Sequence, residues 1–217
     1  KADDPVLRNG PSTWDGSGVG EASVLGPDNA GVFRMWFSGY DARWRSHIGY
    51  ASSEDGTSWR KHEAPVLAPG PTGSWDDQRV QSTRVLQTGD RYEMWFGGNR
   101  GDYFASQIGY ATSRDGIVWV KHAYNPVLRR GPNGTWDDQS VHGHDVYYDR
   151  RMYFMWYGGY DGSVCRAGFA VSPKDLRVVF TPSNGYVPPA ADAVGFQVRV
   201  PHAEDLSFAV RVIAPGG

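Results

Sequence analysis

The sequence contains a single cysteine, Cys165, among its 217 residues. One cysteine cannot form an internal disulfide, so the redox compartment stays open, and we interpret Cys165 as a small residue within a strand. No run of about 18 apolar residues is present, which argues against a membrane span. Residues 1–5 lack the apolar centre of a signal peptide, which leaves open a leader that was removed earlier.

The sequence also lacks an excess of charge of either sign. Its formal net charge is −2, with no electrostatic footprint for nucleic acid or for an anionic membrane, and we expect neither as a partner. The cellular location stays open, with a secreted or periplasmic protein slightly favoured.

Glycine and aromatic residues, by contrast, are abundant. The chain has 28 glycines, nine tryptophans and twelve tyrosines. Helical proteins rarely use residues in this way. Glycine-rich turns between short aromatic strands are typical of all-β architectures.

A repeat of about sixty residues is the strongest pattern in the sequence. Five landmarks recur in the same order, and equivalent positions are 59 to 61 residues apart. They are Pro-Val-Leu at Pro5, Pro65 and Pro126; Trp-Asp at Trp14, Trp75 and Trp136; Met-Trp-aromatic at Met35, Met94 and Met155; Gly-aromatic-Ala at Gly49, Gly109 and Gly168; and Ser-x-Asp-Gly-x-x-Trp at Ser53 and Ser113. Such periodicity predicts a repeat architecture.

Each copy is predicted to form four antiparallel strands. In the second copy the alternation of residue types places strands at residues 80–86, 92–97, 107–113 and 119–122. The Gly89-Asp90 and Asp115-Gly116 pairs lie where tight turns need a positive φ. Four strands joined by short turns make one blade of a β-propeller. In the Ser-x-Asp-Gly-x-x-Trp segment, Asp115 is expected to accept hydrogen bonds from turn amides, and the segment resembles the Asp-box hairpin of several propellers.

We therefore predict an all-β, propeller-like fold with three four-stranded blades in residues 1–180, spanning about 5–64, 65–125 and 126–180. The third copy loses the repeat pattern after Ala170. Residues 181–193 are rich in Pro, Ala and Gly and indicate a linker or long loop. Alternation at residues 195–200 and 207–213 then predicts a C-terminal hairpin that caps the domain.

The blade motifs resemble those of the five-bladed propeller glycosidases, the arabinanase, levansucrase and invertase superfamily with its β-mannoside phosphorylase-like branch. The motifs are Asn-Pro-Val-Leu (125–128), Gly-Ser-Trp-Asp-Asp (73–77), Tyr-x-Met-Trp-Phe-Gly-Gly (92–98) and Ile-Gly-Tyr-Ala-x-Ser-x-Asp-Gly (108–116). The resemblance covers about 175 residues. It implies a carbohydrate-active protein with an oligosaccharide or polysaccharide ligand at the channel face.

Three repeats supply three blades, whereas the resemblance implies five in a closed ring. Open sheet edges must be covered or paired. Either further blades lie outside this chain, or the terminal hairpin covers one side, or several copies form a homo-oligomer that completes the ring.

The resemblance also implies one carboxylate per blade near the start of the innermost strand. Glu21 occupies this position in the first copy, Ser82 in the second and Gly143 in the third, with Asp145 nearby. A glycosidase needs an acid and a base or nucleophile. Glu21 and Asp145 are the candidate catalytic pair, but the missing carboxylates leave catalysis undecided. The alternatives are a non-catalytic carbohydrate-binding module and a structural or assembly module.

Other polar residues are predicted near the same face of the fold. In a regular strand, His142 and His144 would share one face. A metal ion at these two histidines is the less favoured reading, and we expect no cofactor. The candidate substrate-binding residues are Tyr40, Asp41, Arg84, Asn99, Arg100, His142, His144, Tyr160 and Asp161. Aromatic planes, carboxylates and amides suit sugar recognition, although turn-forming Asp and packing Tyr explain several of them equally well.

Overall fold

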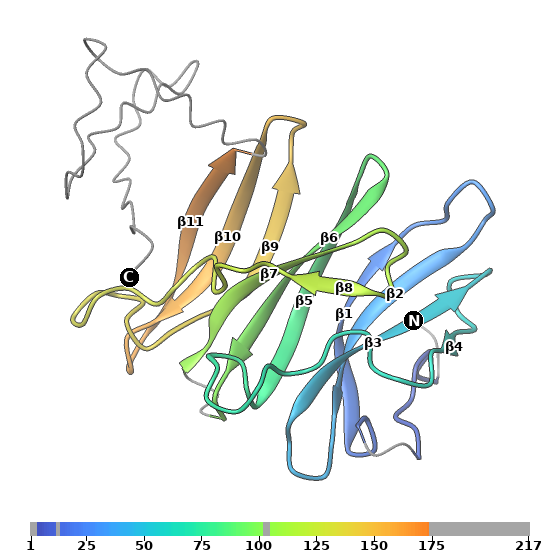
Figure 1. The fold of residues 1–217 in the computed structure, drawn as a ribbon, viewed down its shortest axis with the longest axis horizontal. Helices are drawn as coiled ribbons and strands as arrows, with labels where there is room; N and C mark the ends of the chain where they lie inside the picture. Colours follow the sequence, from blue (N-terminus) through green and yellow to red (C-terminus); the bar gives the residue numbers. More distant parts are fainter. Residues whose placement is uncertain (1–3, 12–13, 102–104, 174–217) are drawn as a thin grey trace, which may run out of the picture. The chain divides into compact units, whose positions relative to one another are not determined.

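The computed structural model describes residues 4–11, 14–101 and 105–173, and the C-terminal linker and hairpin predicted at 181–217 lie outside these ranges. The described chain is all-β, with eleven named strands and no α-helix (Figure 1). No helix in the described ranges has the length and apolar character needed to cross a membrane.

The strands form three antiparallel sheet modules, one for each sequence repeat. Module 1 contains β1 (Gly18–Leu25), β2 (Phe33–Tyr40), β3 (Ser46–Ser53) and β4 (Arg60–Lys61). Module 2 contains β5 (Arg79–Thr88), β6 (Arg91–Asn99), β7 (Gln107–Ser113) and β8 (Trp119–Lys121). Module 3 contains β9 (Ser140–Tyr148), β10 (Met152–Tyr160) and β11 (Cys165–Pro173). A single parallel bridge between Ser46 and Arg79 joins the first two sheets.

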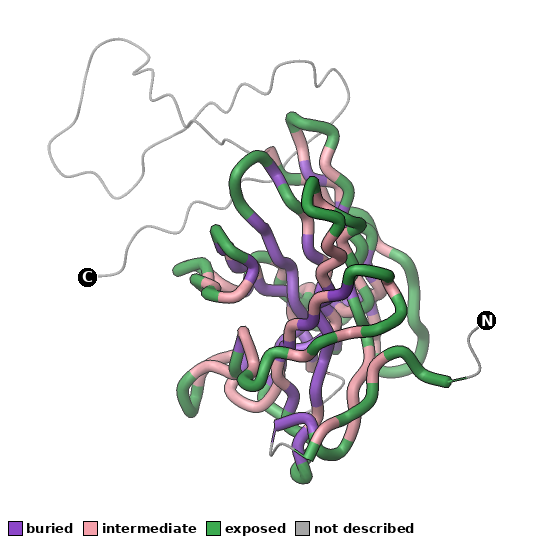
Figure 2. Tube along the Cα trace, turned by 90° about the vertical axis from the view of Figure 1, so that its right-hand side faces the viewer, coloured by how far each residue is buried: buried purple, intermediate pink, exposed green. Residues whose placement is uncertain are grey.

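Among the described residues, two of the three clusters of buried hydrophobic residues lie between successive modules, and the third lies within module 1. One cluster joins Trp36 and Ile48 of module 1 to Val85 and Met94 of module 2. A second cluster joins Trp95 of module 2 to strands of module 3. The first strand of each module also contacts the first strand of the next, β1 with β5 and β5 with β9. Buried positions are frequent in β2 and β6, and in Figure 2 they run through the interior of the trace, whereas many exposed positions lie at its outer turns.

The repeated Trp-Asp loops are anchored by glycines in the sheets. A Cβ atom at Gly39 would lie 2.3 Å from the Trp14 ring, and one at Gly159 would lie 2.2 Å from the Trp136 ring. Glycine at these positions lets an indole lie directly on the strand. Trp14, Trp75 and Trp136 are thus loop anchors, as their regular spacing predicts.

The two Asp-box hairpins form as the motif predicts. One oxygen of Asp115 accepts hydrogen bonds from the backbone N–H groups of Ile117 and Val118, at 2.8 Å each. Gly116 has φ 78° and its carbonyl accepts the indole N–H of Trp119 at 2.9 Å. The same carbonyl accepts the indole N–H of Trp36 at 2.8 Å, so this hairpin also contributes to the interface between modules 1 and 2.

Candidate functional site

The first strand of every module carries a β-bulge at the same repeat position. The pairing register shifts between Gly20 and Ser23 in β1 and between Gln81 and Arg84 in β5, and β9 has the same irregularity opposite Trp156 and Gly158. The bulged residues are Glu21, Ser82 and Gly143, with φ of 50°, 53° and 55°. A positive φ costs a side-chain-bearing residue free energy, and bulges recur next to functional sites because they re-aim side chains.

The three bulged residues line one cavity of about 300 Å³. All three modules contribute to its wall. The lining residues are Glu21, Gln81, Ser82, Gly97, Ser106, Ser140, His142, Gly143, Tyr160 and Cys165. The positions that the resemblance associates with channel carboxylates are therefore brought together. We refer to this space as the Glu21 cavity.

Glu21 is held by donors from two modules. Its Oε2 atom accepts hydrogen bonds from the Ser38 hydroxyl at 2.9 Å, the Tyr40 hydroxyl at 3.0 Å and the backbone N–H of Ser82 at 3.2 Å. Among the described residues no group donates to Oε1. The carboxylate is thus fixed through one oxygen, and the other remains able to accept a hydrogen bond from a ligand.

Next to each bulge, a glycine on one of the first two strands of the module faces a larger residue on the other, and the strand that carries the glycine differs between modules. Module 1 places Gly20 on its first strand and Ser38 opposite it. Module 3 reverses the sizes, with His142 on β9 facing Gly158 on β10. A Cβ atom at Gly158 would lie 3.1 Å from Nε2 of His142, so the missing side chain makes room for the imidazole. Module 2 follows module 3, with Gln81 opposite Gly97.

The two candidate histidines of β9 lie in different surroundings. His142 lines the Glu21 cavity, and its Nδ1 atom is 3.3 Å from the Ser140 hydroxyl. The bulge interrupts the alternation of the strand, and His144 is not among the cavity-lining residues. Both ring nitrogens of His144 are enclosed, and burial lowers its pKa to about 4.

Arg84 and Asp145 meet each other outside the cavity wall. Their side chains form an ion pair of 2.9 Å between modules 2 and 3, and the Asp145 side chain is 73% exposed. Arg84 also donates to the backbone carbonyl of Val146 at 3.4 Å. Asp145 is thus not among the described residues that share the Glu21 cavity.

The remaining candidates follow the second strands of the modules. Tyr40 reaches Glu21, and Tyr160 lines the cavity. Asn99 is buried, donates to the Ser106 hydroxyl at 3.1 Å and accepts from Gly101. Arg100 is exposed in the following loop.

Asp41 and Asp161 are engaged in their own turns. Asp41 accepts from the backbone N–H groups of Arg43 and Arg45 and from the Arg45 guanidinium. Burial alone would raise the pKa of Asp41, but these bonds outweigh it and hold the pKa below its ordinary value. Asp161 makes the same kind of turn, and its ion pair with Arg166 heads the interactions that lower its pKa.

Several cavity residues were not selected from the sequence. Ser106, Ser140 and Cys165 carry no repeated motif, and the spacing of the landmarks does not point to them. Gln81 and Ser82 stand at the repeat position of the bulge, which was the available signal. In the described ranges, no group of three or more His, Cys, Asp and Glu side chains is arranged to hold a metal ion.

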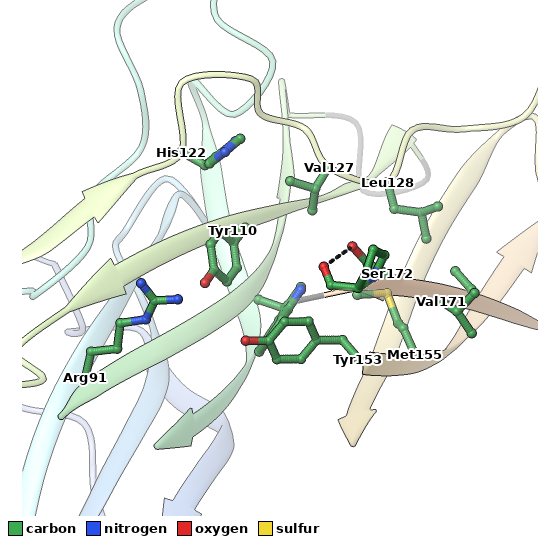
Figure 3. A pocket seen from close by; sticks show the side chains of 12 residues that line it. Arg91, Tyr110, His122, Val127, Leu128, Tyr153, Met155, Val171 and Ser172 are labelled. Atoms are coloured by element: carbon green, nitrogen blue, oxygen red, sulfur yellow. Dashed lines mark hydrogen bonds between the residues drawn. The ribbon is translucent and has the colours of Figure 1, made fainter. Parts of the chain in front are cut away.

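A larger cavity of about 450 Å³ lies between modules 2 and 3, away from the bulges. Arg91, Tyr110 and Tyr153 line it together with aliphatic residues such as Val127 and Leu128 (Figure 3). It lies beside Trp95, whose repeat counterpart Trp36 is covered by the ring of Trp119 at 6.1 Å. Module 3 lacks a Trp at the matching place of its sequence. The place in the third repeat that matches Trp119 lies outside the described residues.

Comparisons with known proteins place the fold among carbohydrate enzymes. No family model matches the sequence. The chain is 18% identical to a family 117 glycoside hydrolase of Zobellia galactanivorans, with a TM-score of 0.62 over 76% of this chain and 57% of that one. It is 20% identical to an N-acetylgalactosamine deacetylase of Flavonifractor plautii, solved in complex with blood group B trisaccharide, with a TM-score of 0.58 over 76% of this chain and 52% of that one. These likenesses show that the fold is shared.

Proteins related in sequence match only part of their own length. An uncharacterised protein of Mycobacterium tuberculosis is 29% identical over 163 residues, which are 71% of this chain and 52% of that protein. A Flavonifractor plautii deacetylase of A type blood N-acetyl-alpha-D-galactosamine is 26% identical over 140 residues, 58% of this chain and 18% of the enzyme. The chain thus spans about half the length of the first of these relatives.

Proposed function

We propose that this chain is part of a β-propeller protein that binds a glycan in the Glu21 cavity, and that modules 1 to 3 are three of its blades. The observation that carries the proposal is the convergence of three bulges, one from each module, on one cavity, with Glu21 and Ser82 both held at a positive φ. Backbone strain kept at Glu21 and Ser82, equivalent positions of two modules, is typical of a site rather than of packing, and glycine fills the same position without strain in the third module. The fold shared with glycan-acting enzymes supports a glycan as the class of ligand.

The cavity residues suit a sugar hydroxyl and a sugar ring. Oε1 of Glu21 would accept a hydrogen bond from a hydroxyl, while Ser82 and Ser140 offer further polar contacts. Tyr160 would supply an aromatic plane and His142 a second polar edge. Asn99 would act through Ser106, to which it is hydrogen-bonded.

Binding is favoured over cleavage by the number of carboxylates. Hydrolysis of a glycosidic bond ordinarily requires two carboxyl groups about 5 to 9.5 Å apart across the bond. Within the described lining of the cavity, Glu21 is the single carboxylate. A second candidate function, glycoside hydrolysis, would need Asp145 to leave Arg84 and turn toward the substrate; the fold likeness to a glycoside hydrolase favours it.

The experiment is a glycan array with the full chain, followed by calorimetric titration of the strongest ligand. We expect Glu21→Gln to weaken binding about tenfold or more, because a charged acceptor is replaced by a neutral amide. Glu54→Gln alters an exposed carboxylate in an Asp-box turn and is the matched control. Unchanged affinity in Glu21→Gln would contradict the proposal.

The same preparation separates the two functions. Release of reducing sugar that disappears in both Glu21→Gln and Asp145→Asn would establish hydrolysis. Binding without turnover would establish a recognition module.

A further inference from the structure

Module 3 exposes an aromatic surface that its counterparts bury. Here the side of a module toward the next repeat is called its trailing face, and the opposite side its leading face. On the trailing face of module 3, Trp156 is 50% exposed, Phe169 54% and Tyr147 59%. The repeat counterparts of Trp156 are Trp36 and Trp95, which are 0% and 5% exposed. Contiguous exposed aromatic surface of this kind marks an interaction site.

Modules 2 and 3 cover the two buried tryptophans in the same way. The Trp36 ring packs against Tyr92 of module 2, with ring centroids 5.6 Å apart. The Trp95 ring packs against Tyr153 of module 3 at 5.0 Å. Tyr92 and Tyr153 occupy the same repeat position, on the leading face of each module. The third member of this position is Phe33 of module 1.

The exposed pair on module 3 already has the geometry of the buried pairs. Each trailing-face tryptophan packs against one aromatic residue of its own module. These pairs have centroid distances and interplanar angles of 5.6 Å and 54° for Trp36–Tyr50, 5.1 Å and 53° for Trp95–Tyr110, and 5.3 Å and 48° for Trp156–Phe169. The surface of module 3 is therefore preorganised for a leading face, without rearrangement.

The lack of hydrogen-bonding groups on the exposed surface of module 3 indicates which leading face can pack against it. At the interface of modules 2 and 3, Glu93 accepts hydrogen bonds from the hydroxyls of Tyr110 and Tyr153, at 2.8 and 2.6 Å. On module 3 the positions of Glu93 and Tyr110 are held by Phe154 and Phe169, which offer no hydrogen-bonding group. A tyrosine hydroxyl buried against them would lose its partner. A phenylalanine suits this surface.

Tyr92 at the other interface also meets polar groups. Burial lowers the pKa of the Arg34 guanidinium, but the hydrogen bond with Asp28, followed by the nearby Tyr92 and Tyr50, outweighs burial and raises this pKa. Both tyrosine-bearing leading faces thus meet a charged residue, and the phenylalanine-bearing face of module 1 matches the apolar surface of module 3.

The leading face of module 1 also offers space for an incoming tryptophan. A Cβ atom at Gly116 would lie 2.8 Å from Cζ2 of Trp36, which shows how closely a trailing-face indole approaches the Asp-box glycine. At the equivalent Gly56, the nearest atom to such a Cβ belongs to Phe33, at 3.8 Å. At Gly116 the Trp36 indole fills the space beside the glycine. Among the described residues, no indole fills the equivalent space beside Gly56.

We propose that the trailing face of module 3 docks on the leading face of module 1 of a second copy of this chain. Trp156 would lie against Phe33 and donate its indole N–H to the carbonyl of Gly56, as Trp36 does to Gly116. Such a contact is head-to-tail, so each copy offers one donor face and one acceptor face.

The test is the mass of the full chain in solution, measured by light scattering and sedimentation over a range of concentrations. We expect the wild-type protein to be a dimer or a larger assembly. Trp156→Glu and Phe33→Glu should each give monomers, because each places a charge in the apolar contact. A mixture of the two variants should form a one-to-one dimer, since each retains the face that the other has lost. Trp44→Glu changes a residue that is 61% exposed and lies in a turn of module 1, and it should keep the wild-type mass.

Three results would overturn the proposal. A monomeric wild-type chain at all soluble concentrations would show that a second copy does not occupy this face, including the case in which residues 174–217 of the same chain cover it. An assembly that persists in Trp156→Glu would place the contact elsewhere. Two variants that remain monomeric when mixed would exclude a head-to-tail contact. Circular dichroism of each variant verifies that the sheets are intact.

Discussion

At the scale of single residues, His144 shows how the bulge of β9 changes the chemistry of a side chain. Neither ring nitrogen makes a hydrogen bond of standard geometry within the described chain. Burial disfavours the imidazolium and lowers the pKa to about 4, although the Trp95 backbone and the carboxylates of Asp145 and Glu21 act in the opposite direction. His144 is therefore predominantly neutral in the folded protein at neutral pH.

This shift predicts a stability change in mildly acidic solution. In the unfolded chain His144 takes up a proton near its ordinary pKa of 6.5, whereas in the fold it does so near 4. The contribution to stability is complete above pH 6.5 and is lost as the pH falls from about 6.5 to about 4, because the unfolded state then binds more protons. The loss should be on the order of 2 kcal/mol, allowing for partial exposure.

The measurement is the free energy of unfolding as a function of pH. His144→Gln should flatten the curve in this range relative to wild type. An equal slope in wild type and His144→Gln would show that the imidazole titrates normally in the fold.

At the scale of structural elements, the two Asp-box hairpins allow the interface between modules to be measured. Gly56 and Gly116 have nearly the same φ, 75° and 78°. A Cβ atom at Gly116 meets the Trp36 ring, whereas one at Gly56 meets ordinary contacts. In the Trp156→Glu background, where no second copy is expected to cover Gly56, Gly56→Ala should cost about 1 kcal/mol through backbone strain alone.

Gly116→Ala should cost the same strain and about 1 to 3 kcal/mol more, because the added methyl group displaces the Trp36 indole. Chemical denaturation of both variants gives the difference directly. Equal losses of unfolding free energy in the two variants would mean that the Trp36 indole moves aside without an energetic cost.

The strands themselves could be predicted largely from alternation and turn residues. The predicted strand 107–113 coincides with β7, and the prediction 80–86 falls within β5 (Arg79–Thr88). Alternation succeeds because these strands have one regular buried face. The prediction 119–122 runs one residue past β8, which ends at Lys121.

The bulges could not be predicted in the same way. A bulge adds a residue without changing the composition of the strand, so Glu21 and Ser82 carry no local signal for it, whereas Gly143 is a glycine within a strand, which often marks a bulge. A strict alternation places His142 and His144 together, and the extra residue separates them. The repeat position was predictable from the resemblance, whereas the cavity residues Ser106, Ser140 and Cys165 depend on how the modules meet, which short-range patterns do not encode.

At the scale of the molecule, stability depends on interfaces between modules more than on any single sheet. Glu93 is fully buried on β6 and is held by Tyr153 of module 3, by Tyr110 and Thr88 of its own module and by Arg91. Burial alone would raise the pKa of Glu93, but these hydrogen bonds outweigh it and lower the pKa. The carboxylate is thus ionised inside the interface, and its partners must stay in place.

Tyr153→Phe therefore tests whether modules 2 and 3 unfold as one body. The substitution removes one donor from a buried carboxylate and should destabilise the fold by about 1 to 3 kcal/mol. Tyr124→Phe removes a hydroxyl from a side chain that is 81% exposed and should be close to neutral. In urea, with tryptophan fluorescence as the probe, we expect a single transition at lower midpoint and unchanged slope, because Trp36 and Trp95 both lie in interfaces between modules. A shallower slope, or a second transition for Tyr153→Phe, would instead mean that module 3 separates from module 2 before the rest of the chain unfolds.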